Sequence, residues 1–356
     1  MKNSIIFKDM EDIFERDIPW NKLENKTLLL TGAYGMLASY ITYMVAYLNT
    51  HGGMHTKLIA VVRSEKKFYE HFGGNFCKSF PLRIIESTMT EPLQIDERVD
   101  YIVHAASLAS PQYYSTVPVE VIEPNVLGTY YLLQLAREKK SEGFLLFSTG
   151  DIYGKVDDPT NITEETTGKA DPLDVHSCYG ESKRLAETLC AAFWREYSVP
   201  TKMARIFHTY GPTMNIHNDP RVFASFLKCA LEGQNIIMQS DGTACRPFCY
   251  IADAVAAYFL ILLSGNSGEA YNVANTQEFL SIRELAQIVV ELRPELGLTV
   301  QYKARDKDDS YVENQLNKDN RPREDKLRQL GWKTKFTTRA GMMRCLNYFL
   351  SGDVDN

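Results

Sequence analysis

The sequence predicts an α/β protein with a doubly wound parallel sheet and a second, smaller α/β domain interleaved with it. Three observations lead to this fold class. Short apolar runs typical of strands alternate with amphipathic stretches typical of helices. A glycine-containing turn joins the first of these strands to the first helix. The chain has 356 residues, which is enough for about two domains.

The elements are expected in the following order along the chain. The predicted strands are Thr27–Thr31, Leu58–Val62, Leu82–Glu86, Tyr101–His104, Phe144–Ser148, Lys202–Phe207 and Ala270–Val273. Helical patterns cover 35–49, 116–140, 179–197, 221–233, 251–264 and 281–292. Residues 1–24 are expected to form an accessory helix before the first strand. The charged, irregular stretch from Tyr302 to Arg323 is expected to be a loop over the second domain.

Charge and composition limit the partners of the protein. Lys and Arg number 39 against 45 Asp and Glu, a net charge of −6, and no basic stripe is present. This balance disfavours nucleic acid and favours a small-molecule partner. The seven cysteines are scattered, with no CxxC pair and no metal-ligand spacing, which indicates reduced thiols and no metal.

Targeting signals are not apparent in the sequence. The first residues, MKNSIIFKDMEDIFERDIPW, contain acidic side chains and lack the apolar core of a signal peptide. No run reaches the roughly 18 apolar residues that a membrane span requires. We therefore expect a cytoplasmic protein that does not associate with membranes.

The turn after the first strand is typical of dinucleotide binding. Gly32 permits a tight turn, Gly35 lets the backbone approach a pyrophosphate, and Ala38 lets the helix pack close to the sheet. The N–H groups at the start of the following helix then face the anion. The sequence therefore predicts a Rossmann-like sheet with a bound dinucleotide.

This turn and the order of the strands suggest the domain boundaries. The last two predicted strands return to the sheet after an excursion of the chain. We expect a dinucleotide-binding domain over 25–207 and about 247–276, and a substrate-binding domain over about 208–246 and 277–350.

The choice between NAD and NADP is open at the end of the second strand. An acidic residue there normally binds the adenosine ribose. This chain has Arg63, followed by Ser64. Such a pair can cradle a 2′-phosphate, or Arg63 can stack on adenine or point to solvent. NAD is expected, and NADP stays an alternative because of Arg63.

A tyrosine and a lysine at the start of one predicted helix can form a base. Tyr179 and Lys183 are four residues apart and therefore share a helix face. A nearby ammonium stabilises a phenolate, which lowers the pKa of a tyrosine from its usual value of about 10. Thr149 and Asp151 follow the fifth strand, at the sheet edge where ligands of such folds bind.

These motifs together resemble those of the extended short-chain dehydrogenase/reductase family, in particular its nucleotide-sugar epimerases, dehydratases and decarboxylases. The resemblance covers about residues 25–345, and the closest subgroup is the UDP-glucuronate decarboxylases. It rests on the following segments: Gly32-x-x-Gly35-x-x-Ala38, His104–Pro111, Asn125–Thr129, Thr149, Tyr179-x-x-x-Lys183, Arg205–Pro212 and Arg246–Asp253.

The resemblance implies roles for the matching residues. Tyr179 is expected to be the base, Lys183 the cofactor anchor that tunes it, and Thr149 a hydrogen-bond partner of the sugar 4-hydroxyl. Ala105 and Asn125 are expected to contact the cofactor.

The resemblance also implies a substrate-binding set. Arg246 and Arg221 match arginines that hold phosphate or sugar in relatives, and Tyr114 matches a tyrosine near the sugar. His208 stands where the family commonly has Asn. Members of the family pair through the helices near 116–140 and 179–197, so a homodimer is expected.

The reaction that follows oxidation at C4 stays open. Dehydratases of the family carry Asp-Glu directly after the threonine and decarboxylases carry Ser-Glu, whereas this chain has Gly150 and Asp151. The missing acid disfavours loss of the 6-hydroxyl. A 4-keto hexuronate is a β-keto acid that loses CO2 with little side-chain help, so decarboxylation of a UDP-hexuronate, to UDP-xylose or its 4-keto form, is the leading hypothesis.

Three alternatives are retained. A 4-epimerase needs only the Thr–Tyr–Lys set and is the first alternative, and a 4,6-dehydratase is the second. A non-catalytic dinucleotide-binding scaffold is the alternative from another class, and the intact Thr149, Tyr179 and Lys183 argue against it. The nucleotide base and the sugar are not determined by these motifs.

Overall fold

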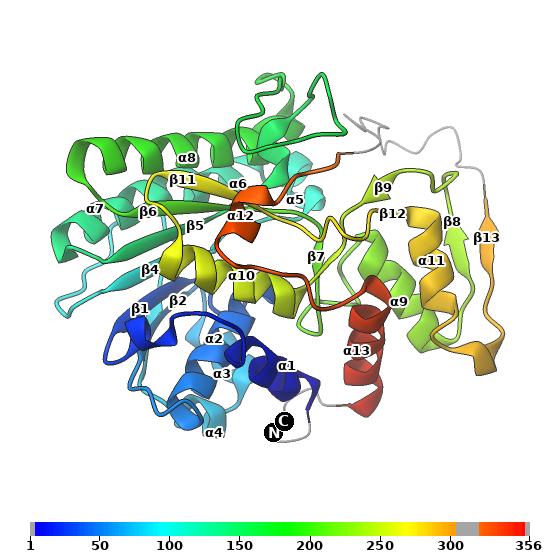
Figure 1. The fold of residues 1–356 in the computed structure, drawn as a ribbon, viewed down its shortest axis with the longest axis horizontal. Coiled ribbons are helices and arrows are strands. Elements are labelled where there is room, and N and C mark those ends of the chain that lie inside the picture. The colour runs from blue at the N-terminus through cyan, green and yellow to red at the C-terminus, as the bar shows by residue number, and fades with distance from the viewer. Residues whose placement is uncertain (1–3, 304–319, 353–356) are drawn as a thin grey trace.

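The centre of the protein is a seven-stranded, fully parallel sheet, seen in a computed structural model that describes residues 4–303 and 320–352 (Figure 1). The strand order is β11-β6-β5-β4-β1-β2-β3. The strands are β1 (Thr27–Thr31), β2 (Lys57–Val62), β3 (Leu82–Glu86), β4 (Tyr101–His104), β5 (Gly143–Thr149), β6 (Thr201–Ile206) and β11 (Glu269–Val273). The doubly wound α/β fold is thus confirmed, and each predicted strand is present to within one residue at either end.

Helices cover both faces of this sheet, and the strand sequences explain why. Leu28 and Leu30 of β1 belong to one buried cluster and Leu29 to another, because successive side chains of a strand point to opposite faces. On the first face lie α1 (Ile5–Phe14), α2 (Met36–Thr50), α3 (Glu65–Phe72) and α10 (Ile251–Ser264). On the second lie α7 (Thr129–Lys139) and α8 (Cys178–Tyr197). A strand covered on both sides has to be apolar throughout, which is the pattern in the sequence.

Part of the remaining chain forms smaller units beside the sheet, on the right of Figure 1. Three pairs of short strands are present: β7 (Thr209–Tyr210) with β10 (Cys249–Tyr250), β8 (Ile236–Met238) with β13 (Val300–Tyr302), and β9 (Cys245–Arg246) with β12 (Leu280–Ser281). The remaining α-helices are α4 (Gly74–Cys77), α5 (Pro111–Thr116), α6 (Pro118–Glu123), α9 (Val222–Glu232), α11 (Ile282–Val290), α12 (Asp325–Gln329) and α13 (Thr338–Ser351). Between β6 and β11 the chain passes through α9 and returns by α10. The domain boundaries stay a prediction.

One predicted helix, 116–140, is wrong as a single element. Thr116 ends α5, and a new helix begins at Pro118. The preceding Val117 is not helical, at φ −142° and ψ 55°, because a residue before proline is pushed out of the helical region. A π-helical turn over Pro124–Gly128 then separates α6 from α7. Pro124 has no N–H to donate, so the regular hydrogen-bond ladder cannot pass through it.

Helix α13 was not predicted, and its sequence explains why. Gly341 interrupts its helical pattern, and glycine weakens a helix by about 1 kcal/mol. A Cβ at this position would collide with the Tyr210 ring system, so the glycine lets α13 pack against β7. The central part of the predicted loop 302–323 lies outside the described residues.

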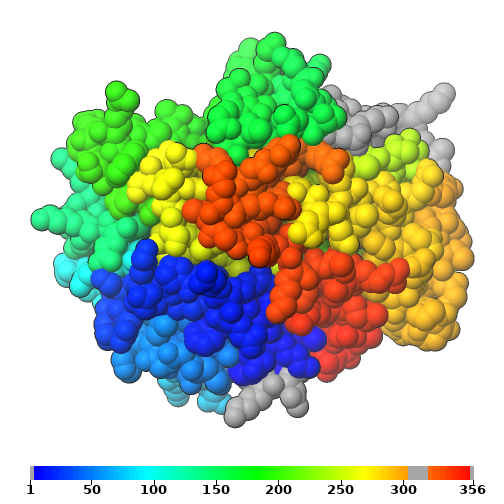
Figure 2. Space-filling view, viewed as in Figure 1, coloured from blue at the N-terminus to red at the C-terminus, as the bar shows by residue number. Residues whose placement is uncertain are grey.

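The N-terminal helix α1 is joined to the C-terminal part of the chain by buried polar groups. Figure 2 shows the two ends, blue and orange-red, side by side on one face. Asp9 is fully buried and accepts hydrogen bonds from Tyr40 of α2 (2.8 Å) and Tyr250 (2.5 Å), and it pairs with Arg344 of α13. Burial raises the pKa of Asp9 to about 6.

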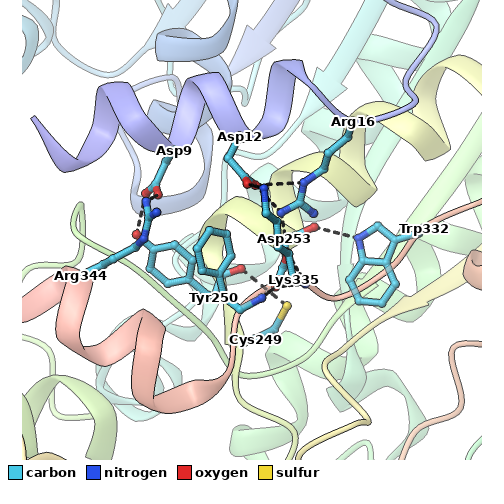
Figure 3. Close-up of polar contacts among 10 residues, drawn as sticks. Asp9, Asp12, Arg16, Cys249, Tyr250, Asp253, Trp332, Lys335 and Arg344 are labelled. Atoms are coloured by element: carbon cyan, nitrogen blue, oxygen red, sulfur yellow. Dashed lines mark hydrogen bonds and ion pairs between the residues drawn. The ribbon is translucent and has the colours of Figure 1, made fainter. Parts of the chain in front are cut away.

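A second buried carboxylate, Asp253 of α10, lies beside this group (Figure 3). Arg16 bridges it to Asp12 of α1, with 2.7 Å to Asp253 and 2.6 Å to Asp12. The backbone N–H groups of Lys335 and Phe336 also donate to Asp253. The accessory helix is therefore part of the polar interior.

Two further features follow from the chain as described. All seven cysteines lie in the described residues and none forms a disulfide. Within residues 4–303 and 320–352, none of the helices combines the length and the apolar character needed to cross a membrane.

Replacing Asp9 tests whether α1 contributes to the core. We expect Asp9→Ala to lower the free energy of unfolding by about 3–5 kcal/mol, because it leaves Tyr40, Tyr250 and Arg344 without their acceptor. Urea denaturation measures the change. Glu11→Ala, an exposed position of the same helix, is the control and should change stability by less than about 0.5 kcal/mol. Equal effects in both variants would contradict this role of Asp9.

Candidate active site

The predicted phosphate-binding turn lies at the carboxyl end of β1. Gly32 has φ +68°, and a Cβ there would lie 3.0 Å from Cα of Ala106. Gly35 is the N-cap of α2 and brings no capping side chain, so the N–H groups of the first turn stay available. Ala38 is buried where α2 meets the sheet. The turn therefore has the geometry of an anion cradle.

A buried histidine fixes the loop that faces this turn. The hydroxyl of Thr31 accepts from the N–H groups of Ala105 and Ala106, at 3.0 Å each, and donates to Nδ1 of His104 (2.8 Å). Nε2 of His104 then donates to the carbonyl of Pro124 (2.9 Å), because a carbonyl can only accept. Burial, with Lys183 nearby, lowers the pKa of His104 to about 3, so the ring is neutral.

Tyr179 and Lys183 point into the interior from the first turns of α8. Nζ of Lys183 donates to the carbonyl of Phe147 (2.8 Å) and lies 6.0 Å from the centre of the Tyr179 ring. Burial lowers the pKa of Lys183 to about 7. Burial and Asp151 raise the pKa of Tyr179 above its usual value, whereas Thr149 and Arg221 act in the opposite direction. The phenol is therefore protonated unless a further positive charge approaches it.

Thr149 and Asp151 end β5 directly opposite this pair. Thr149 caps a short helical turn by accepting from the N–H of Asp151 (3.2 Å). Asp151 is exposed to solvent, but many protein atoms lie near its carboxyl. The desolvation that they cause raises the pKa of this carboxyl. Arg246 lowers the same pKa. An accessible carboxyl of this kind is suited to proton exchange with a ligand.

Gly150, between them, has no room for a side chain. A Cβ at this position would lie 2.5 Å from the ring of Phe207, which is itself buried against Tyr153. The acid or hydroxyl that the sequence resemblance led us to look for at this position is therefore sterically excluded while Phe207 keeps its place.

Tyr114 lies against Tyr179. Its ring stacks on that of Tyr179, with 5.2 Å between centroids and 12° between planes. Burial raises the pKa of Tyr114 above its usual value. Both rings therefore form one wall of the site.

His208 lies near two arginines, Arg221 and Arg246, which both influence its protonation. His208 has φ +25°, a strained value for a side chain of this size, and its Nδ1 is buried without a hydrogen-bond partner in the part of the chain that the structure describes. Burial and the two arginines lower its pKa to about 3. The guanidinium of Arg221 donates three hydrogen bonds to the carboxylate of Asp219.

Asn125 and Arg63 lie further from this group. Asn125 is in the π-helical turn, donates to Val121 and Ser182, and has a buried Oδ1 that lacks a partner among the described residues. Arg63 is exposed after β2, and β1 separates β2 from β4 in the sheet. Its neighbour Ser64 caps α3, which gives that hydroxyl a structural role.

Some polar residues near the site were not singled out from the sequence. Ser107 and Ser110 follow β4, and both hydroxyls are buried without a partner in the described residues. Glu187 is buried on α8, one turn after Lys183. In the sequence, the two serines are marked only by their position in the 104–111 segment, and Glu187 only by its four-residue spacing from Lys183. Neither feature indicates a functional site unless the fold is known.

Comparison with known proteins identifies the family. Residues 28–274 match the NAD dependent epimerase/dehydratase family. The chain belongs to this family, and it is an NAD-dependent enzyme of the type that the sequence motifs predicted.

Its relatives include several decarboxylases. UDP-glucuronic acid decarboxylase 6 of Arabidopsis thaliana is 37% identical over 265 residues, which cover 73% of this chain and 71% of that protein. UDP-glucuronic acid decarboxylase 1 of Danio rerio is 32% identical over 329 residues, 92% of this chain and 73% of the relative.

Solved structures show the same fold at lower identity. UDP-glucose 4-epimerase of Thermotoga maritima, solved with UDP-glucose, has a TM-score of 0.74 at 21% identity, covering 92% of this chain and 99% of that one. MoeE5 in complex with UDP-glucuronic acid and NAD has a TM-score of 0.71 at 21% identity with the same coverage.

The residues of this chain fit NAD. The space at Gly32 that a Cβ would close, the uncapped start of α2, and the unpartnered hydroxyls of Ser107 and Ser110 all lie around the end of β1 and β4. Gly32, Gly35 and the backbone near Ala105 would hold the dinucleotide, with Lys183 near its nicotinamide end. Arg63 is exposed, and the hydroxyl of its neighbour Ser64 already caps α3.

Substitution of Gly32 tests the cradle. We expect Gly32→Ala to weaken NAD binding about tenfold or more, because Cβ strain and contact with Ala106 displace the turn. Isothermal titration and the NAD content of the purified protein measure this. Gly53→Ala is the matched control, since Gly53 has φ +66° but open space around it. NAD binding unchanged in Gly32→Ala would refute the assignment.

Proposed function

We propose that this enzyme is a UDP-glucuronate decarboxylase, which oxidises the sugar at C4 and then releases CO2. The observation that carries the proposal is the end of β5, where Thr149 and Asp151 flank a glycine covered by Phe207. This arrangement retains the hydroxyl of Thr149 and the carboxyl of Asp151, but position 150 has no acidic side chain that could protonate a departing 6-hydroxyl. The names of the relatives at 32–38% identity support the same reaction.

The first step is proton removal from the 4-hydroxyl. Tyr179 accepts this proton, and Thr149 orients the hydroxyl from the opposite side. Lys183 holds its positive charge behind the phenol. NAD, when bound, supplies the hydride acceptor and a further positive charge that favours the phenolate.

The second step requires little from the side chains. Oxidation at C4 places a ketone β to the carboxylate, and a β-keto acid loses CO2 readily. Asp151 is placed to return a proton to C5, because the raised pKa of its carboxyl favours the protonated form. Tyr114 confines the ring beside Tyr179.

The substrate diphosphate is proposed to bind at His208, Arg221 and Arg246. The two arginines supply charge in a protein that is acidic on average. His208 is neutral, so its unpartnered Nδ1 donates or accepts a hydrogen bond without adding charge. These side chains come from 208–246, the segment assigned to the substrate-binding domain.

Tyr179→Phe tests the proposed base. The variant keeps the ring that stacks on Tyr114 but loses the hydroxyl, so we expect kcat with UDP-glucuronate to fall by about 10²–10⁴-fold. NAD content and UDP-glucuronate binding should persist. Tyr197→Phe, on the exposed end of the same helix, is the control.

Mass spectrometry of the product identifies the reaction. The expected result with UDP-glucuronate is loss of CO2 alone if the hydride returns to C4 and gives UDP-xylose, or loss of CO2 and two hydrogens if the 4-keto form leaves and NAD stays reduced. Loss of water from UDP-glucose or dTDP-glucose would indicate a dehydratase, and an unchanged mass with altered retention a 4-epimerase. Absence of any product and of NAD reduction with each sugar would indicate a scaffold.

We also propose that the enzyme is a cytoplasmic homodimer that pairs through the helices of the second face. Large apolar side chains are exposed along this surface: Val119 and Ile122 on α6, Leu127 in the π-helical turn, Tyr130 on α7 and Leu185 on α8. One face of α8 packs on the sheet, and the other carries Leu185 outward. A partner covering this second face would remove apolar surface from water.

Leu185→Glu tests the pairing surface. A charge at this position, which is 46% exposed in the single chain, is expected to convert a dimer to a monomer in size-exclusion chromatography with light scattering. Ile237→Glu, at a 57% exposed position on β8, should leave the dimer intact. A monomeric wild type would rule out the dimer itself.

A further inference from the structure

A buried carboxylate lies directly behind the lysine of the site. Glu187 follows Lys183 by four residues on α8, so both side chains project from the same helix face. The side chain of Glu187 is only 10% exposed. Glutamate at such a position is uncommon unless the carboxylate is paired.

Two strands hold this carboxylate in place. Ser148 of β5 donates to Oε1 of Glu187 (2.5 Å), and Arg205 of β6 donates through Nη2 to Oε2 (2.8 Å). Ser148 and Arg205 are neighbours in the strand register. Glu187 therefore fastens α8 to both strands at one level of the sheet.

Glu187 is bound at the same end of β5 as the residues proposed to carry out the reaction. Ser148 stands between Phe147, whose carbonyl accepts from Lys183, and Thr149. Any shift of α8 along β5 would therefore change the distances from Lys183 and Tyr179 to Thr149 together. The hydrogen bonds of Glu187 oppose such a shift.

The charges around Lys183 make Glu187 electrostatically important as well. The titratable groups facing Lys183 are Tyr179, Glu187 and Cys190 on α8 and His104 on β4. Burial keeps His104 and Tyr179 neutral, and it raises the pKa of Cys190 well above that of a free thiol. Among these described groups Glu187 is the one anion, and Arg205 of β6 pairs with it, so the carboxylate lies between two cations.

We propose that Glu187 is a positioning residue for the reaction, which keeps Lys183 protonated in its buried place and holds α8 in register with Thr149. The expected effect of Glu187 on turnover rests on the proposed C4 oxidation, whereas its expected effect on the protonation of Lys183 does not. An ammonium buried without a counter-charge would lose its proton, because desolvation penalises the charged form. Burial already lowers the pKa of Lys183 to about 7, and Glu187 opposes this decrease.

Glu187→Gln is the informative variant, because the amide keeps the size and an acceptor oxygen but removes the charge. The pKa of Lys183 should fall, so the lysine loses its proton at a lower pH than in the wild type. Activity that needs the ammonium then declines earlier as pH rises. We expect the alkaline limb of the kcat profile with UDP-glucuronate to move down by about one pH unit.

A direct titration separates this inference from the proposed reaction. Lysines labelled with ¹³C at Cε are followed by NMR in the NAD-loaded enzyme, and the signal of Lys183 is assigned by its loss in Lys183→Arg. Its midpoint should fall by about one pH unit in Glu187→Gln. Glu196→Gln, exposed at the far end of α8, should leave it unchanged.

Each outcome is decisive. An unchanged midpoint in Glu187→Gln overturns the inference, whatever the substrate. A shifted midpoint with no turnover of UDP-glucuronate by the wild type supports Glu187 and contradicts the proposed function. If Glu187→Gln does not fold, Glu187→Asp withdraws the charge by one methylene and should produce a smaller shift in the same direction, and no shift there overturns the inference.

Discussion

The buried carboxylate of Asp253 connects parts of the chain that are far apart in sequence. It receives Arg16 from α1 and two backbone N–H groups from the segment before α13, while its own helix α10 packs on the sheet. Asp9 makes the equivalent connection from α1 to α2 and α13. Because α2 carries the phosphate-binding turn, these pairs link the position of that turn to the C-terminal part of the molecule.

The same constraint, that a buried charge needs a partner, shapes the site. Lys183 is buried at the end of β5, where the carbonyl of Phe147 accepts its hydrogen bond, and the nearby carboxylate of Glu187 is itself paired with Arg205. His104 is neutral because burial and Lys183 disfavour its charged form. Asp151 is exposed, and burial of its surroundings raises the pKa of its carboxyl. Burial thus assigns different protonation states to groups that lie close together.

Much of this arrangement was predictable because its causes are local. Strands buried on both faces leave continuous apolar runs, and the glycines of the first turn and the Tyr179–Lys183 spacing are short-range patterns. The predicted helix over 116–140 was wrong where two prolines alter the backbone, and α13 was missed because its glycine suits a ring from β7. Gly341 is required by a contact with another element and not by its own helix, so the helical pattern of the sequence could not predict α13.

The sequence by itself determined the fold class, the glycine turn after β1, and the placement of Thr149 at the end of β5 and of Tyr179 and Lys183 at the start of α8. Only the tertiary structure decided that Phe207 covers Gly150, that His208 holds a strained backbone between two arginines, and that Glu187 meets Ser148 and Arg205 behind Lys183. The physical reason is range. Backbone geometry and amphipathic spacing act between near neighbours in sequence, whereas steric exclusion and charge pairing in the interior join residues that only folding brings together.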